Sequence, residues 1–81
     1  MSQVTEIQNF EQLNNLIINN KQLIVIDFNA DWCGPCQNIK PKFHDFSKQY
    51  KNVTFCSVDI DDQDEIGEEF GITNLPTFLF T

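Results

Sequence analysis

The 81-residue sequence contains no arginine, and its five lysines are outnumbered by twelve acidic residues, which gives a net charge of −7. Nucleic acids and anionic membrane surfaces are bound mainly through clustered basic side chains, so this scarcity argues against both partners. The longest apolar run, at residues 23–26, is far shorter than the about 20 residues that cross a bilayer. The first 22 residues hold no apolar block like that of a secretory leader, so we expect a cytoplasmic protein.

Cysteine is also scarce, with three residues in the chain. An odd number cannot form the closed disulfide framework of a small secreted domain. A structural zinc site needs four ligands, and beyond the pair Cys33 and Cys36 the chain offers only Cys56 and His44. Zinc is therefore disfavoured, and we expect no metal. Cys56 stands within an apolar run, where a buried and inert thiol is expected.

The acids gather at residues 59–69, where a calcium loop is one interpretation. An EF-hand that began at Asp59 would need glycine at its sixth position and glutamate at its twelfth, and the chain has Asp64 and Phe70 there. A solvated helix start, with acids near its positive end, is the better interpretation.

Glycine and proline number only three each, so few residues interrupt the apolar pattern. No linker or repeat divides the chain, and residues 1–81 are expected to form one domain. The pattern predicts strands at residues 3–7, 23–29, 53–60 and 77–81, alternating with three helices: from the N-cap Asn9 to residues 19–20, from Cys33 to about Tyr50, and from 62 to 70 with a stop at Gly71. This alternation is typical of an α/β fold with right-handed crossovers.

The cysteine pair falls at the junction between the second strand and the second helix. Free amides and the helix dipole favour an anion there, so the pKa of Cys33 should fall toward neutrality. Cys36 lies one turn further on, in a core-facing apolar stripe that continues with Ile39, Phe43, Phe46 and Tyr50. Gly34 and Pro35 keep the turn between the cysteines small and stiff. This asymmetry predicts that Cys33 attacks a substrate disulfide and that Cys36 resolves the mixed disulfide. A purely structural disulfide would close a very short loop and stabilise little.

The stretch VIDFNADWCGPC, followed by Pro41 and then by NLPTFLF, resembles the thioredoxin family along nearly the whole chain. The resemblance implies a thioredoxin-like fold with a central mixed β-sheet flanked by helices. It implies a protein-disulfide reductase that works by dithiol–disulfide exchange and needs no bound cofactor beyond the redox-active Cys33–Cys36 disulfide. The implied partners are disulfide-containing proteins and a flavin-dependent thioredoxin reductase that draws electrons from NADPH.

Asp27 is the one charged residue in the apolar second strand, between Ile26 and Phe28. Burial there would raise its pKa, because desolvation penalises the charged form. The resemblance implies that Asp27 accepts and donates the proton of Cys36 during disulfide exchange. A fully hydrogen-bonded carboxylate with a structural role is the alternative.

Four further residues enter through the resemblance. It implies that Pro76 is cis and lies beside the cysteine pair, and that the backbone of Leu75 pairs with substrate as an added strand. Thr77 is assigned to the same substrate contact, and Trp32 to an aromatic wall beside the site. A trans proline at a strand start and a tryptophan in the core are the alternatives.

The chain departs from the family pattern at four places. Asp31 adds a negative charge two residues from Cys33, which should offset part of the thiolate stabilisation. Asn29 stands where many members carry tryptophan, so looser packing behind the site is expected. Ser57 stands where several carry lysine, which removes one charged neighbour of Asp27. Family members continue past the last strand into another strand and helix, so we expect a C-terminally incomplete domain with an apolar strand edge.

Two rival functions remain open. One is a disulfide-forming oxidase or isomerase, against which the Gly-Pro between the cysteines and the lack of a leader argue. The other is a protein-binding module that uses the thioredoxin fold and whose redox chemistry is incidental.

Overall fold

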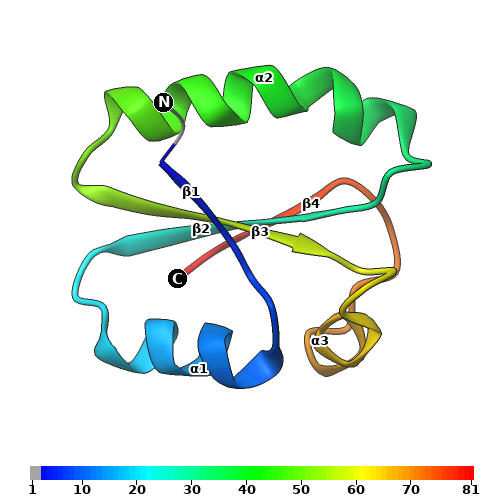
Figure 1. The fold of residues 1–81 in the computed structure, drawn as a ribbon, viewed down its shortest axis with the longest axis horizontal. Coiled ribbons are helices and arrows are strands. Elements are labelled where there is room, and N and C mark those ends of the chain that lie inside the picture. Colours follow the sequence, from blue (N-terminus) through cyan, green and yellow to red (C-terminus); the bar gives the residue numbers. More distant parts are fainter. Residues whose placement is uncertain (1–2) are drawn as a thin grey trace.

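A computed structural model of the chain describes residues 3–81. The elements are β1 (Val4–Glu6), α1 (Phe10–Asn19), β2 (Leu23–Asn29), α2 (Gly34–Gln49), β3 (Val53–Asp59), α3 (Asp64–Glu69) and β4 (Thr77–Phe80). One sheet has the strand order β1-β3-β2-β4. Strands β1, β3 and β2 are parallel, and β4 runs antiparallel to β2, so the sheet is mixed. The predicted α/β alternation is confirmed, with α2 on one face and α1 and α3 on the other (Figure 1).

Strand β2 lies inside the sheet and is buried on both faces, as its continuous apolar sequence predicted. Ile24, Ile26 and Phe28 alternate onto the core shared with α1 and α3. Val25 points the other way and packs with Phe43 of α2. Since side chains alternate along a strand, Asp27 shares the face of Val25 and lies under α2.

Helix α1 begins where the capping pattern predicted. The side chain of Asn9 accepts a hydrogen bond from the backbone N–H of Gln12 at 2.8 Å. The Gln12 side chain accepts in turn from the N–H of Gln8 at 2.6 Å, one residue before the cap. Two of the amides at this helix entry are thereby satisfied, and Leu13 is held fully buried against the sheet.

Helix α2 differs from its predicted apolar stripe in its second half. Phe43 is buried, but Phe46 and Tyr50 are 43% and 51% exposed, and the buried position there belongs to Ser47. The Ser47 hydroxyl donates to the carbonyl of His44 and accepts from the backbone N–H of Gln3. These two bonds offset the cost of burying the hydroxyl. Phe46 and Tyr50 instead line an apolar groove of about 410 Å³ between α2 and the sheet.

Helix α3 ends as predicted. Gly71, just past the helix, has φ of +64°, a left-handed conformation that glycine adopts without a steric penalty. Ile66 of α3 is buried, and the ring centroids of Phe70 and Phe28 are 5.8 Å apart. Within residues 3–81, no helix is long and apolar enough to span a membrane.

Leu13 and Ile18 lie on the same helix but differ in burial, since Leu13 is fully buried and Ile18 is 69% exposed. We expect Leu13→Ala to lower the free energy of unfolding by about 2–5 kcal/mol, because it removes buried methyl groups and leaves a cavity. Ile18→Ala should cost less than about 1 kcal/mol. Urea unfolding followed by circular dichroism measures both. Similar losses for the two variants would contradict this assignment of the core.

Candidate active site

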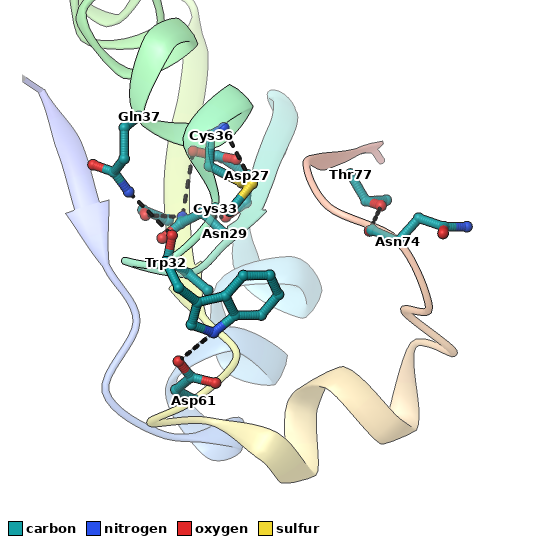
Figure 2. Close-up of a disulfide and its surroundings, with 11 residues drawn as sticks. Asp27, Asn29, Trp32, Cys33, Cys36, Gln37, Asp61, Asn74 and Thr77 are labelled. Carbon is teal, nitrogen blue, oxygen red and sulfur yellow. Dashed lines mark hydrogen bonds between the residues drawn. A yellow bond between two sulfur atoms is a disulfide. The ribbon is translucent and has the colours of Figure 1, made fainter.

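The two cysteines lie where the strand β2 leads into the helix α2. Cys33 is the N-cap of α2, and its sulfur accepts a hydrogen bond from the backbone N–H of Cys36 at 3.2 Å. The two residues are joined in a disulfide, with their Cα atoms 5.2 Å apart (Figure 2). Gly34 and Pro35 are exposed in the first turn, where a proline costs nothing because its missing N–H has no helical partner.

Both cysteines are buried in the disulfide form. Cys33 is 5% exposed and Cys36 is 1% exposed, so the predicted difference in access has the expected direction but is small. They pack with Ala30, which is fully buried, and against Ile60 and Leu75. The sequence-distant Leu75 is thus brought to the cysteine pair.

The loop before β4 carries the other predicted substrate contacts. The peptide bond between Leu75 and Pro76 is cis, as the family resemblance implied. The Thr77 hydroxyl donates to the backbone carbonyl of Asn74 and closes the turn (Figure 2). Leu75 therefore packs against the cluster that holds the cysteine pair, whereas the hydroxyl of Thr77 is engaged within its own loop. That Pro76 lies beside the disulfide stays a prediction.

Trp32 is 69% exposed, so the alternative of a core tryptophan is wrong. Its indole N–H donates to the Asp61 carboxylate at 2.9 Å, which fixes the ring beside the disulfide (Figure 2). Sequence reasoning missed Asp61, because it is one of several neighbouring acids and nothing in the spacing distinguishes it. It also missed Gln37, whose amide donates to the Ala30 carbonyl at 3.1 Å and ties α2 to the loop before it.

Asp27 is 4% exposed, and burial raises its pKa to about 6. A hydrogen bond from the Asn29 amide to Oδ2, at 3.3 Å, opposes this rise. The charge of Glu6 adds to the rise, and that of Lys40 opposes it. The predicted direction is confirmed. Oδ1 is buried without a hydrogen-bond partner among the described residues.

Measured along the direction of β2, Asp27 lies at nearly the same position as Cys36 of α2. Val25 packs on Phe43. Two residues of strand carry Asp27 about 7 Å beyond Val25 toward the cysteine end. Seven residues of helix carry Cys36 about 10 Å beyond Phe43 in the same direction. The carboxyl of Asp27 therefore lies under the first turns of α2, among the groups around the disulfide (Figure 2).

Cys56 is fully buried on β3, and burial raises its pKa to about 11. A neutral thiol is a poor nucleophile and metal ligand, which agrees with the predicted inert role. Across residues 3–81, no group of three or more His, Cys, Asp or Glu side chains is placed to hold a metal ion.

The family model named Thioredoxin matches residues 3–81. Thioredoxin from the pig, Sus scrofa, is 48% identical over 60 residues, which cover 74% of this chain and 57% of the pig protein. The chain belongs to the thioredoxin family. It spans little more than half the length of this curated thioredoxin relative.

Two further comparisons cover nearly all of this thioredoxin-family chain. The structure of mitochondrial thioredoxin 3 from Saccharomyces cerevisiae, in its oxidized form, has a TM-score of 0.88 and 36% identity over 95% of this chain and 72% of that one. The predicted thioredoxin-like fold is thereby confirmed. A peptide-N(4)-(N-acetyl-beta-glucosaminyl)asparagine amidase from Caenorhabditis elegans is 43% identical over 79 residues, which cover 95% of this chain and 13% of the worm protein.

Burial of Asp27 should make stability depend on pH. Its folded-state pKa of about 6 lies above the ordinary value of 3.8, so ionisation costs more in the folded state than in the unfolded state. The stabilisation is full below about pH 4 and is lost as the pH rises through about 6. The loss amounts to about 2–3 kcal/mol.

Asp27→Asn should abolish this loss and raise the free energy of unfolding at pH 8 by a similar amount. Urea unfolding between about pH 4 and pH 8 measures it. The matched control is Asp62→Asn, at an exposed carboxylate, which should retain the slope of the unmodified chain. The same slope in Asp27→Asn and the unmodified chain would contradict the assignment.

Proposed function

We propose that this chain is a thiol–disulfide oxidoreductase that reduces disulfides of protein substrates. The observation that carries the proposal is the Cys33–Cys36 pair at the N-terminus of α2, within a thioredoxin-family fold. The Cys36 amide already donates to the Cys33 sulfur. The same N–H and the helix dipole would stabilise a thiolate there, because both favour the charged form.

The reaction begins with both cysteines reduced. The Cys33 thiolate attacks one sulfur of the substrate disulfide, the substrate S–S bond breaks, and a mixed disulfide forms. The first substrate sulfur leaves as a thiolate and takes a proton from water. Of the pair, Cys33 is the proposed nucleophile because it is the helix cap and the more exposed residue.

Resolution of the mixed disulfide is assigned to Cys36. Asp27, in its ionised form, accepts the proton of the Cys36 thiol. The Cys36 thiolate then attacks the Cys33 sulfur, the mixed disulfide breaks, and the second substrate sulfur leaves as a thiolate. Two electrons have passed to the substrate, and the enzyme is left with the disulfide between Cys33 and Cys36. A carboxyl with a pKa of about 6 exchanges a proton readily near neutral pH.

The substrate is proposed to lie across the disulfide, between Trp32 and the loop of Leu75, Pro76 and Thr77. Trp32 offers an exposed aromatic ring held by Asp61. An extended peptide could pair with the backbone of Leu75 as an added strand, which is a common mode of peptide recognition. This contact selects extended segments that carry a disulfide.

Regeneration needs a two-electron reductant, which we propose to be a flavin-dependent thioredoxin reductase supplied by NADPH. No bound cofactor enters the proposed cycle, since the cysteine pair itself carries the electrons. The proposed compartment is the cytoplasm, where thiols are kept reduced. The yeast relative is mitochondrial, so the family alone does not set the compartment.

Insulin reduction with dithiothreitol as electron donor tests the proposed activity. Cys33→Ser should abolish catalysis, because it removes the nucleophile. Cys36→Ser should also stop turnover but accumulate the mixed disulfide with substrate, which mass spectrometry detects. Cys56→Ala is the matched control and should retain activity, since that thiol is buried on the other face of the sheet. Full turnover by Cys33→Ser would exclude the mechanism.

Asp27→Asn tests the proton transfer. A thiol with the ordinary pKa of about 8.5 remains a few per cent ionised at pH 7, so we expect reduction to slow by roughly 10- to 30-fold there. The loss should shrink toward pH 9, where the thiol ionises without help. Steady-state rates between about pH 6 and pH 9 measure this. An unchanged rate across that range would remove Asp27 from the mechanism.

A binding module is the second candidate function. One observation favours it: the worm amidase contains a segment 43% identical to this chain within a much longer protein. In a module, the fold would dock a partner, and the cysteine pair would be incidental. A Cys33→Ser/Cys36→Ser protein that restores the full cellular function of a deletion strain would decide for the module.

A further inference from the structure

The side chain of Asn29 joins β2 to β3 at the cysteine end of the sheet. Its amide nitrogen donates to the Ser57 hydroxyl at 2.8 Å, to the Asp27 carbonyl at 3.1 Å and to Asp27 Oδ2 at 3.3 Å (Figure 2 draws Asn29 and Asp27). An amide nitrogen has two hydrogens. The shortest bond takes one of them, and the two Asp27 oxygens share the other.

Ser57 is placed to hold this arrangement. It is 8% exposed and is the register partner of Asp27 on the neighbouring strand. Aligned residues of paired strands share a face, so the hydroxyl lies on the α2 side with the carboxyl. Ser57 therefore fixes the rotation of the Asn29 amide without carrying a charge.

The consequence falls on the two oxygens of Asp27. Oδ2 accepts the amide N–H, and an amide N–H cannot itself accept a proton. Oδ1 is buried and has no hydrogen-bond partner among the described residues. In the neutral acid the proton is therefore expected on Oδ1.

We propose that Asn29, anchored by Ser57, is a positioning residue that assigns the two oxygens of Asp27: Oδ2 accepts the amide hydrogen bond, and Oδ1 exchanges the proton with Cys36. The inference rests on the proposed role of Asp27 in disulfide exchange. In the transfer, the Cys36 S–H bond breaks and an O–H bond forms on Oδ1, with no change of oxidation state. Asn29 acts through Asp27 and takes no part in the bond changes.

The other groups around Asp27 do not provide this assignment. Glu6 faces it from β1 and Lys40 from α2, and both are exposed and act through their charge. On β4, the residue opposite Asp27 is the apolar Phe78. Asp59 is the register partner of Asn29 on β3. Cys33 and Cys36, at the start of α2, are titratable groups on the same side of the sheet as Asp27.

A carbon-13 NMR titration of the Asp27 carboxyl tests the inference without substrate. In Asn29→Ala the midpoint should rise by roughly 0.5 to 1 pH unit, because a hydrogen bond to the charged form is lost. Asn29→Ser keeps a shorter hydrogen-bond donor, so its midpoint should lie between those of the unmodified chain and Asn29→Ala. Asn15→Ala, at an exposed position of α1 on the opposite face, is the matched control and should not move the midpoint.

Ser57→Ala tests the anchor. Alone, it should raise the midpoint by less than Asn29→Ala does, because the amide remains but is no longer held. In the Asn29→Ala background it should have no further effect, since Ser57 acts only through the amide. A further rise as large as that in the single variant would show independent action and overturn the anchoring.

The pH profile of insulin reduction should shift in the same direction as the NMR midpoint. The inference would be overturned if Asn29→Ala or Asn29→Ser melted cooperatively but left the Asp27 midpoint unmoved. This holds even if the variant keeps full reductase activity. Absence of reductase activity in the unmodified chain, with midpoints that shift as expected, would overturn the proposed function and leave the hydrogen-bond assignment standing. The two failures are therefore distinguishable.

Discussion

Burial of β2 on both faces is the constraint on which the rest of this structure depends. The strand pairs with β3 on one side and β4 on the other, and its side chains enter the cores on both faces. Because β2 is held on both sides, the point where the chain leaves it is fixed. The position of Cys33 as the N-cap of α2 is fixed with it. The same strand carries Asp27 into the interior. Scaffold and chemistry thus share one element.

That sharing has an energetic cost. A carboxyl on a buried strand disfavours the folded state above its pKa, and nothing in the sheet neutralises it with a directly paired cation. Asn29 and Ser57 provide neutral hydrogen bonding in place of a charge. The result is a group that is destabilised as an anion and therefore able to take a proton near neutral pH. A stabler core would lack this property.

Local sequence signals predicted most of the fold. The cap at Asn9, the stop at Gly71 and the mostly apolar β2 each depend on near neighbours in the chain, and each lies where expected. The prediction of α2 was less accurate. Period alone placed Phe46 in the core, but the face that meets the sheet there holds Ser47, whose hydroxyl bonds compensate its burial. Helical period identifies a face, and only packing shows how far that face is covered.

The sequence by itself determined the family, the cysteine pair at a strand–helix junction and the buried aspartate, because each is written in residues close together along the chain. Only the tertiary structure decided which distant residues serve them. Asp61 holds the ring of Trp32, Leu75 packs on the disulfide, and Ser57 anchors the amide beside Asp27. These contacts join residues 28 or more positions apart, and strand register and loop packing set them. No pattern within one segment encodes such distances.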